Sequence, residues 1–132
     1  MSDVWFEGLS LPVTDLDASS GFYTALGFAV EIRAPQFCLL RFGSGTLGLL
    51  QVRRPVLEEG GRRQLRSLIQ VELGTDDLDA LYAEFLARDI PVRVPPRDRG
   101  FERSMQLRDP DGFTVEFAEG ARGHNSTTKP NA

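Results

Sequence analysis

The sequence predicts an α+β fold built from two β-α-β-β-β modules, and three observations favour this fold class. Short apolar segments of alternating polarity, separated by glycine or proline, are typical of strands. Two longer segments have the apolar spacing of amphipathic helices. The second half of the chain repeats the order of the first after a shift of 62 residues, which indicates a duplicated structural unit.

The first module is expected at about residues 4–53. Residues 4–13 alternate in polarity near their end and predict a half-buried strand. A helix follows, because Thr14 or Asp15 can cap its start and Gly27 suits the left-handed position after its end. Three further strands are predicted at FAVEIRA (28–34), FCLLRFG (37–43) and TLGLLQV (46–52).

The second module is expected at about residues 66–119, with Asp77 at the position of Asp15 and Phe85 at that of Tyr23. Its elements are predicted at SLIQVEL (67–73), the helix TDDLDALYAEFLARD (75–89), IPVRV (90–94), SMQLR (104–108) and FTVEF (113–117). Each helix covers one face of its own sheet, and the other face needs a cover or lines a cleft. We therefore expect a single domain over residues 1–120, with one curved mixed sheet, a concave cleft and helices on the convex face.

Composition and charge exclude several classes of function. A net charge of −4 over 132 residues argues against nucleic acid as a partner. No apolar run approaches the length of a membrane span, and the N-terminus lacks the pattern of a secretion signal. Cys38 is the only cysteine, so we expect a buried thiol, no intrachain disulfide and a cytoplasmic location. Residues 121–132 are small and polar and predict a mobile tail that carries the sole histidine, His124.

The segment RDPDGFTVEF, residues 108–117, combines a tight turn with an apolar strand that contains one carboxylate, Glu116. A buried carboxylate is costly unless a partner compensates for it. Glu116 is therefore interpreted as a carboxylate hydrogen-bonded to its neighbours or as a polar anchor for an organic ligand. The two interpretations are compatible.

The paired modules, with VTDLDASSGFYTALGF in the first and LRDPDGFTVEF in the second, resemble the vicinal oxygen chelate superfamily over about residues 4–120. This superfamily includes glyoxalase I, extradiol dioxygenases, fosfomycin-resistance enzymes and bleomycin-resistance proteins. Its enzymes hold a divalent metal with histidine and glutamate side chains on the first and last strands of each module. The resemblance places four residues at those positions: Gly8, Gln70, Leu50 (with Gln51 as the neighbouring choice) and Glu116. Because only Glu116 is retained, we expect no metal and no cofactor.

The metal-free bleomycin-resistance-type proteins are dimers that sequester a drug in aromatic-lined grooves between their subunits. The resemblance implies a homodimer, a small-molecule natural product as partner and no catalysis. Phe37 and Phe101 match aromatic positions of those grooves, whereas Gln70 stands where an aromatic residue is common. Strand parity adds residues on the same side as Gly8, Gln70 and Glu116. The expected ligand-binding set is Phe6, Ser10, Phe37, Phe42, Leu50, Leu68, Gln70, Glu72, Phe101 and Glu116.

Several alternatives stay open. Phe37 and Phe42 can also be core residues, and the polar segment 52–66 is a solvated linker or a flap over the groove. Trp5 is a candidate contact between subunits. The predicted function is sequestration of a hydrophobic, aromatic-containing antibiotic without modification. The alternatives are a lyase, isomerase or epoxide-opening enzyme of the same superfamily with a degenerate site, and a ligand sensor or carrier.

Overall fold

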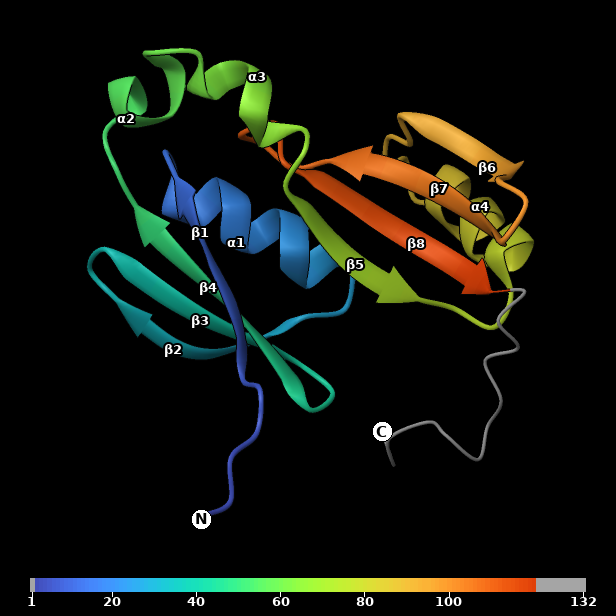
Figure 1. Cartoon of the computed structure of the whole chain (residues 1–132), viewed down its shortest axis with the longest axis horizontal. Coiled ribbons are helices and arrows are strands. Elements are labelled where there is room, and N and C mark those ends of the chain that lie inside the picture. The colour runs from blue at the N-terminus through green and yellow to red at the C-terminus, as the bar shows by residue number, and fades with distance from the viewer. Residues whose placement is uncertain (1, 121–132) are drawn as a thin grey trace. The chain divides into compact units, whose positions relative to one another are not determined.

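The computed structural model describes residues 2–120, and the predicted tail with His124 lies outside the described residues. The chain divides into two compact units, with the boundary between Arg63 and Gln64. Each unit contains one β-α-β-β-β module (Figure 1). The predicted α+β class with two modules is confirmed, and it takes the form of two four-stranded sheets, one in each unit.

Unit one, the first module, has its strands in the order β1-β4-β3-β2, with β1 parallel to β4 and the other pairs antiparallel. Helix α1 contacts β2, β3 and β4 and covers one face of this sheet. Buried apolar side chains of the strands, among them Leu11, Cys38 and Leu49, meet Leu16 and Tyr23 of the helix. The bounds of its elements are β1 (Gly8–Val13), α1 (Leu16–Ala25), β2 (Ala29–Ala34), β3 (Phe37–Phe42) and β4 (Gly45–Gln51).

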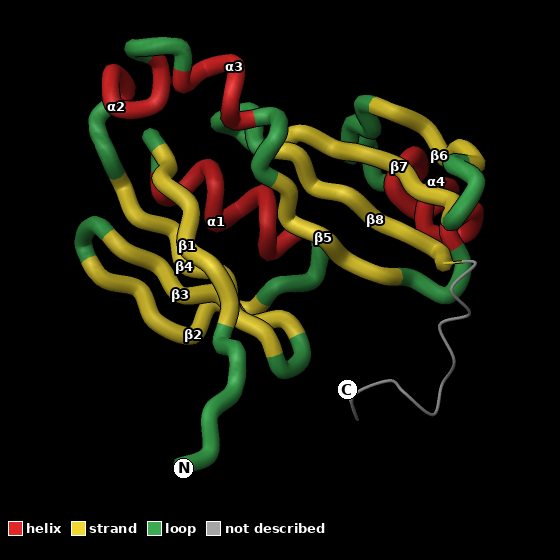
Figure 2. The backbone as a smooth tube through the Cα atoms, in the orientation of Figure 1, coloured by secondary structure: helices red, strands yellow, loops and turns green. Residues whose placement is uncertain are grey.

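Unit two repeats this plan with the strand order β5-β8-β7-β6 (Figure 2). Strand β5 is parallel to β8. Helix α4 contacts β6, β7 and β8, and its Phe85 packs edge-on against Phe117 at a ring-centroid distance of 5.3 Å. The bounds of its elements are β5 (Gln70–Gly74), α4 (Leu78–Ala87), β6 (Val94–Asp98), β7 (Glu102–Arg108) and β8 (Thr114–Gly120).

The two module helices begin in the same way, as the sequence repeat predicts. The carboxylate of Asp15 accepts a hydrogen bond from the N–H of Ala18, and that of Asp77 accepts one from Ala80, each at 3.0 Å. These bonds satisfy N–H groups that the helix itself leaves without partners. At the end of α1, Gly27 has a φ of 116°, the left-handed conformation expected there.

Several predicted elements have different bounds in the structure. The strand expected at 90–94 lies at Val94–Asp98 and contains two prolines, which an edge strand tolerates because one side of its backbone needs no partner. The first strand begins only at Gly8, and the strand predicted at 67–73 begins at Gln70. The segment interpreted as a linker or flap forms two short helices, α2 (Arg54–Glu58) and α3 (Arg62–Arg66). In α2, a proline in the first turn favours the helix start, and Leu57 is buried.

Cys38 is buried in β3, as expected, with its sulfur 3.8 Å from the hydroxyl oxygen of Ser20. Among residues 2–120, no helix combines the length and the apolar character needed to span a membrane.

Candidate functional site

Glu116 lies in the middle of β8, on the face of its sheet that α4 does not cover. Its neighbours Val115 and Phe117 are buried on the helix side, and side chains alternate along a strand. In the sheet register, Glu116 lies between Glu72 on β5 and Gln106 on β7. We call this side the helix-free face of unit two, and its strand residues include Gln70, Glu72, Ser104, Gln106, Arg108, Thr114 and Glu116, with Arg97 opposite Ser104.

The buried carboxylate of Glu116 is compensated by a guanidinium group. The Nη1 atom of Arg99 donates to Oε2 of Glu116 at 2.9 Å, and Nε2 of Gln106 donates to the same oxygen at 3.2 Å. The side chain of Glu116 is only 5% exposed, whereas that of Arg99 is 33% exposed. The ion pair therefore holds a cationic group at the protein surface above a buried anion, which offsets the cost of burying that anion.

Arg99 also contacts an aromatic ring. Its guanidinium carbon lies 5.5 Å from the ring centroid of Phe101, within the range of a cation–π interaction. Both residues sit in the turn between β6 and β7, where the N–H of Arg99 donates to the carbonyl of Glu102 at 2.8 Å. The carboxylate of Asp98 accepts a hydrogen bond from Gly100, whose φ of 92° requires a residue without a side chain. The turn thus fixes the backbone on either side of Arg99.

The RDPDG turn sets where β8 begins. The carboxylate of Asp109 accepts hydrogen bonds from the N–H groups of Asp111 and Phe113, at 2.9 and 3.0 Å. Gly112 takes a φ of 93° at the tip of this turn. The turn joins β7 directly to β8 and so aligns Gln106 with Glu116. The RDPDG motif therefore fixes the position of Glu116, which follows the first residue of β8, Thr114, by two residues.

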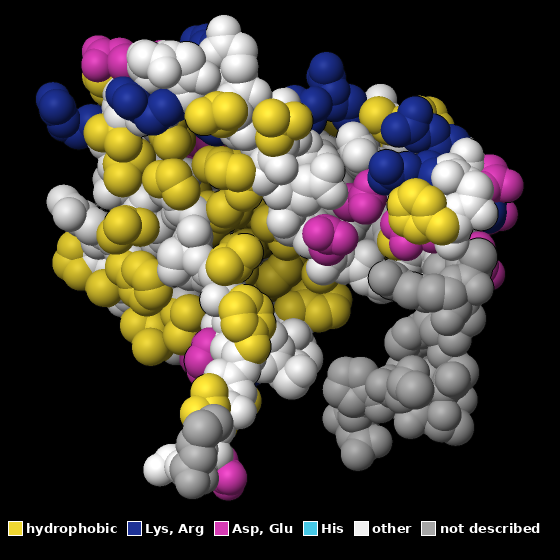
Figure 3. All heavy atoms as spheres, in the orientation of Figure 1, with side chains coloured by type: hydrophobic (Ala, Val, Ile, Leu, Met, Phe, Trp, Pro, Cys, Tyr) yellow, Lys and Arg dark blue, Asp and Glu magenta, His cyan; other side chains and the backbone are white. Residues whose placement is uncertain are grey.

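The helix-free face of unit one has a different character, because apolar side chains surround a glycine. Its central residues are Ser10, Pro12, Phe37, Leu39, Gly48 and Leu50, and Gly8, Arg41 and Thr46 continue the same face. A Cβ atom added at Gly48 would lie 2.3 Å from the hydroxyl oxygen of Ser10 and 3.2 Å from the ring of Phe37. Hydrophobic side chains gather over the strands of this unit in Figure 3, and Leu50 is among the exposed ones.

The register corrects one step of the comparison between the modules. In unit one, Ser10 lies opposite Gly48. The sequence repeat places Glu72 at the position of Ser10, and Glu72 lies opposite Glu116 in unit two. The position equivalent to Glu116 is therefore Gly48, not Leu50 or Gln51. Gly48 precedes Glu116 by 68 residues, whereas Gly8 precedes Gln70 by 62, so the shift that aligns the first strands does not align the last ones.

The structure brings together only some of the predicted site residues. Ser10, Phe37 and Leu50 share one face in unit one, and Gln70, Glu72 and Glu116 share one face in unit two. Phe42 lies on the opposite side from Phe37, where its ring packs against Phe28 at a centroid distance of 4.9 Å and stays 42% exposed. Phe6 and Leu68 precede their strands and are exposed, so strand parity does not place them.

Two site residues, Arg99 and Gln106, are missing from the sequence prediction. Gln106 could have been found, because it has the parity of the helix-free face within the predicted strand SMQLR. Arg99 carried no such signal, because it belongs to a turn that the sequence marks only as irregular.

The side chains at the family's metal positions do not form a site for a metal ion. In unit one, Gly8 and Gly48 have no side-chain donor. In unit two, the carboxylate of Glu116 is engaged by Arg99 and Gln106, and Gln70 offers only an amide. Within residues 2–120, no group of three or more His, Cys, Asp or Glu side chains is placed to hold a metal. The positive charge that lies beside Glu116 in this structure is the guanidinium of Arg99.

Comparison with known proteins agrees with the duplicated module. The sequence profile of the Glyoxalase/Bleomycin resistance protein/Dioxygenase superfamily matches residues 5–117. The chain belongs to this superfamily. No curated protein matches it.

Solved structures with the same fold include a drug-resistance determinant, an antibiotic binding protein and a lyase. The bleomycin resistance determinant encoded on the transposon Tn5 is 24% identical, with a TM-score of 0.69 over 89% of this chain and 99% of its own. TnmS3, an antibiotic binding protein from Streptomyces sp. CB03234, is 22% identical, with a TM-score of 0.69 over 92% and 99%. Lactoylglutathione lyase from Agrobacterium tumefaciens is 23% identical, with a TM-score of 0.69 over 93% and 98%. These identities establish a shared fold, and the function has to be argued from the site.

Proposed function

We propose that this protein binds and sequesters a hydrophobic, aromatic-containing natural-product antibiotic without modifying it. The observation that carries the proposal is the ion pair between Arg99 and Glu116, at 2.9 Å. In the superfamily's enzymes the equivalent carboxylate serves a metal, whereas here an internal guanidinium occupies it. The site then offers binding groups in place of a Lewis acid.

The helix-free face of unit one supports an apolar ligand. Phe37 is half-buried beside Gly48, and Leu50, its partner across the strands, is exposed. Aromatic side chains bury large areas and stack with preferred geometry, so an aromatic ligand gains affinity from such a surface. Two proteins of the same fold, the Tn5 bleomycin resistance determinant and TnmS3, are by their names a drug-resistance and an antibiotic-binding protein. Protection by mass action requires abundant protein and a dissociation constant below the toxic drug concentration.

The proposal includes a single ligand-binding domain over residues 1–120 and a two-fold symmetric homodimer. Trp5 is 71% exposed and is the candidate for the dimer contact. Light scattering at micromolar concentration, with and without Trp5→Ala, tests this part. A monomer that still binds ligand would remove the shared groove from the proposal.

Recovery of the ligand tests the function itself. The protein is incubated with a panel of aromatic antibiotics, separated by gel filtration with bound compound, and denatured to release it. We expect at least one compound to co-elute and to return unchanged in mass and chromatographic retention. A product of altered mass or configuration would favour the lyase, isomerase or epoxide-opening alternative.

Metal analysis of the same purified protein is an independent test between a binding protein and a metal-dependent enzyme of the superfamily. We expect no stoichiometric zinc, iron, manganese or nickel, because the donor set around Glu116 is incomplete. One tightly held ion per chain would contradict the binding-protein proposal.

A further inference from the structure

We propose that Arg99 is the polar recognition group of the ligand site, and that it selects planar aromatic ligands carrying a carboxylate or a similar pair of acceptor oxygens. This inference rests on the proposed function, because it assigns the polar half of the same ligand. It also reverses the expected role of Glu116. A retained carboxylate suggests a ligand that donates hydrogen bonds or carries positive charge, whereas the structure gives that place to Arg99.

The charge of the Glu116 carboxylate is already compensated by Arg99, and little of the group is exposed. Oε2 of Glu116 accepts from both Arg99 and Gln106, and the side chain is almost fully buried. A cationic group of a ligand that took the place of Arg99 at Oε2 would have to displace it. Displacement costs a charge-assisted hydrogen bond, one of the stronger polar interactions in a protein. Glu116 therefore acts as the support that orients Arg99.

Arg99 has hydrogen-bond donors beyond the one that Glu116 engages. A guanidinium group carries five N–H donors in a planar fork and stays charged at all accessible pH values. Within the described residues, only Nη1 of Arg99 donates a side-chain hydrogen bond, and its acceptor is Glu116. The Nε and Nη2 donors keep the geometry that matches two adjacent oxygens of a carboxylate. A ligand group with two adjacent acceptor oxygens therefore matches the free edge of the Arg99 guanidinium.

An aromatic ring lies beside these donors. Phe101 is 63% exposed, and its ring lies against the guanidinium of Arg99. An exposed aromatic ring next to a fixed guanidinium offers stacking and hydrogen bonding within the length of one small molecule. The ligand group that fits both is an aromatic ring with its acid or paired oxygens attached directly.

Charges nearby restrict how such a ligand approaches. Arg108 lies on β7, two residues from Gln106, and its Nε atom is buried without a hydrogen-bond partner. Glu72 pairs with Glu116 from the β5 side and is exposed, so it repels an anion there. The favourable approach is over β6 and β7, where basic side chains gather in Figure 3.

The experiment uses three probes that share one ring system and differ in charge: 2-naphthoate, 2-naphthamide and 2-(aminomethyl)naphthalene. Dissociation constants are measured with the full chain by NMR titration, which also locates the perturbed amides. We expect 2-naphthoate to bind about tenfold more tightly than the amine, the amide to fall between them, and the amides of residues 99–101 to shift.

The variant Arg99→Met/Glu116→Gln removes both charges and leaves no unpaired carboxylate. We expect it to reduce the preference for the acid to about twofold or less while 2-naphthamide binding changes little. Arg97→Met is the matched control, because Arg97 lies on β6, is exposed and has no ion pair within residues 2–120. It removes the same charge and should keep the preference. Equal loss in both variants would reduce the effect to general electrostatics and overturn the assignment of Arg99.

Two further outcomes overturn this inference without deciding the proposed function. Equal binding of the three probes would leave an aromatic site in place but without recognition by Arg99. Tighter binding of the amine would show that a carboxylate of the protein, and not Arg99, recognises the ligand. The proposed function fails separately, if ligand recovery shows chemical modification or finds no antibiotic bound.

Discussion

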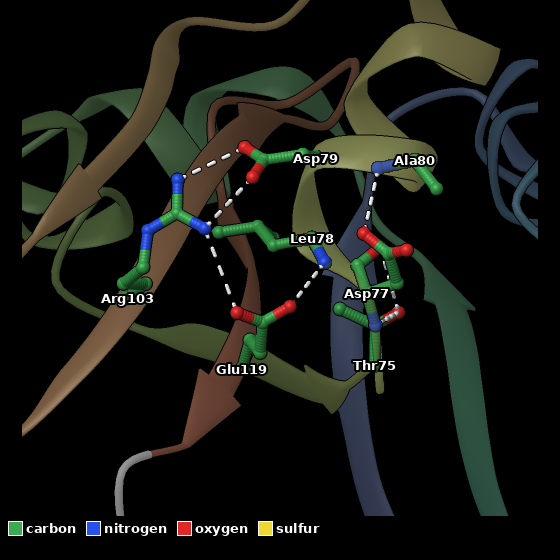
Figure 4. A network of polar contacts seen from close by, with 7 residues as sticks. All are labelled: Thr75, Asp77, Leu78, Asp79, Ala80, Arg103 and Glu119. Atoms are coloured by element: carbon green, nitrogen blue, oxygen red, sulfur yellow. Dashed lines mark hydrogen bonds and ion pairs between the residues drawn. The ribbon is translucent and has the colours of Figure 1, made fainter.

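Glu119, on the last strand of unit two, accepts a hydrogen bond from the N–H of Leu78 at 2.6 Å and so ties β8 to the start of α4 (Figure 4). Its other carboxylate oxygen lies 3.5 Å from Arg103, which also binds Asp79 of the helix. Unit one has the same connection, because Gln51 of β4 accepts a hydrogen bond from the N–H of Leu16 at 3.1 Å. Each module thus uses its last strand to satisfy a free N–H of its own helix.

Glu119→Ala should lower the free energy of unfolding by about 0.5–2 kcal/mol, the usual cost of losing a helix cap. Glu119→Gln is the matched control, because it keeps an acceptor oxygen, as Gln51 does in unit one. Urea denaturation of the three proteins checks this. An effect of Glu119→Gln as large as that of Glu119→Ala would assign the stabilisation to the ion pair with Arg103 instead.

The pKa of Asp79 is lowered from its ordinary value of 3.8, mainly by the hydrogen bonds that it accepts from Arg103. Because this pKa is lower in the folded state, the stabilisation is fully present above pH 3.8 and is lost as the pH falls through the folded value. Melting temperatures between about pH 5 and pH 2 should therefore fall less steeply for Asp79→Asn than for the wild type. The difference should shrink in high salt, since the pair is exposed. Parallel curves for the two proteins at low salt would contradict the link.

Arg99→Met should lower the free energy of unfolding by about 1–3 kcal/mol, because it leaves the buried carboxylate of Glu116 without its cation. Adding Glu116→Gln should recover part of that loss, since the amide no longer carries a buried charge. Chemical denaturation of both single variants and the double variant gives the coupling between the two residues. Additive effects would show that the ion pair contributes nothing to folding.

Phe101→Ala should weaken binding of the recovered ligand by about 1–3 kcal/mol while leaving the melting temperature nearly unchanged. The ring is mostly exposed, so its removal takes little apolar area out of the core. Phe28→Ala provides the contrast, because that ring is buried between Tyr23 and Phe42 and its loss should destabilise the fold. Calorimetric titration and melting curves decide, and a large drop in stability for Phe101→Ala would make it a core residue.

Gly48→Ala should destabilise the protein by about 1–2 kcal/mol, because the added methyl group overlaps the hydroxyl of Ser10. The cost should be smaller in a Ser10→Ala background, where that oxygen is absent. Thermal unfolding of the two single variants and the double variant measures this relief. Equal costs in both backgrounds would locate the constraint at the ring of Phe37 or at the Cβ of residue 10, each 3.2 Å from the added atom.

The sequence by itself determined the parts of the molecule that depend on short-range pattern. The repeat predicted two modules, and Asp15 and Asp77 cap their helices as the capping rule requires. Gly27 ends α1 in the left-handed conformation that glycine favours. The motifs of the two modules also predicted the superfamily to which the chain belongs. These features follow from backbone chemistry within a few residues, so no tertiary information is needed to find them.

Only the tertiary structure decided what surrounds Glu116. Arg99 lies 17 residues before it, and the two meet because β7 runs back from a glycine turn and aligns with β8. The register likewise identifies Gly48, not Leu50, as the counterpart of Glu116. The strand order also makes the proline-containing strand β6 an edge strand of its sheet. Sheet pairing brings together residues that are distant in the chain, and loop lengths between strands shift the alignment. The local sequence pattern does not indicate either effect. Arg99 could therefore be identified as the partner of the buried Glu116 carboxylate only in the folded structure.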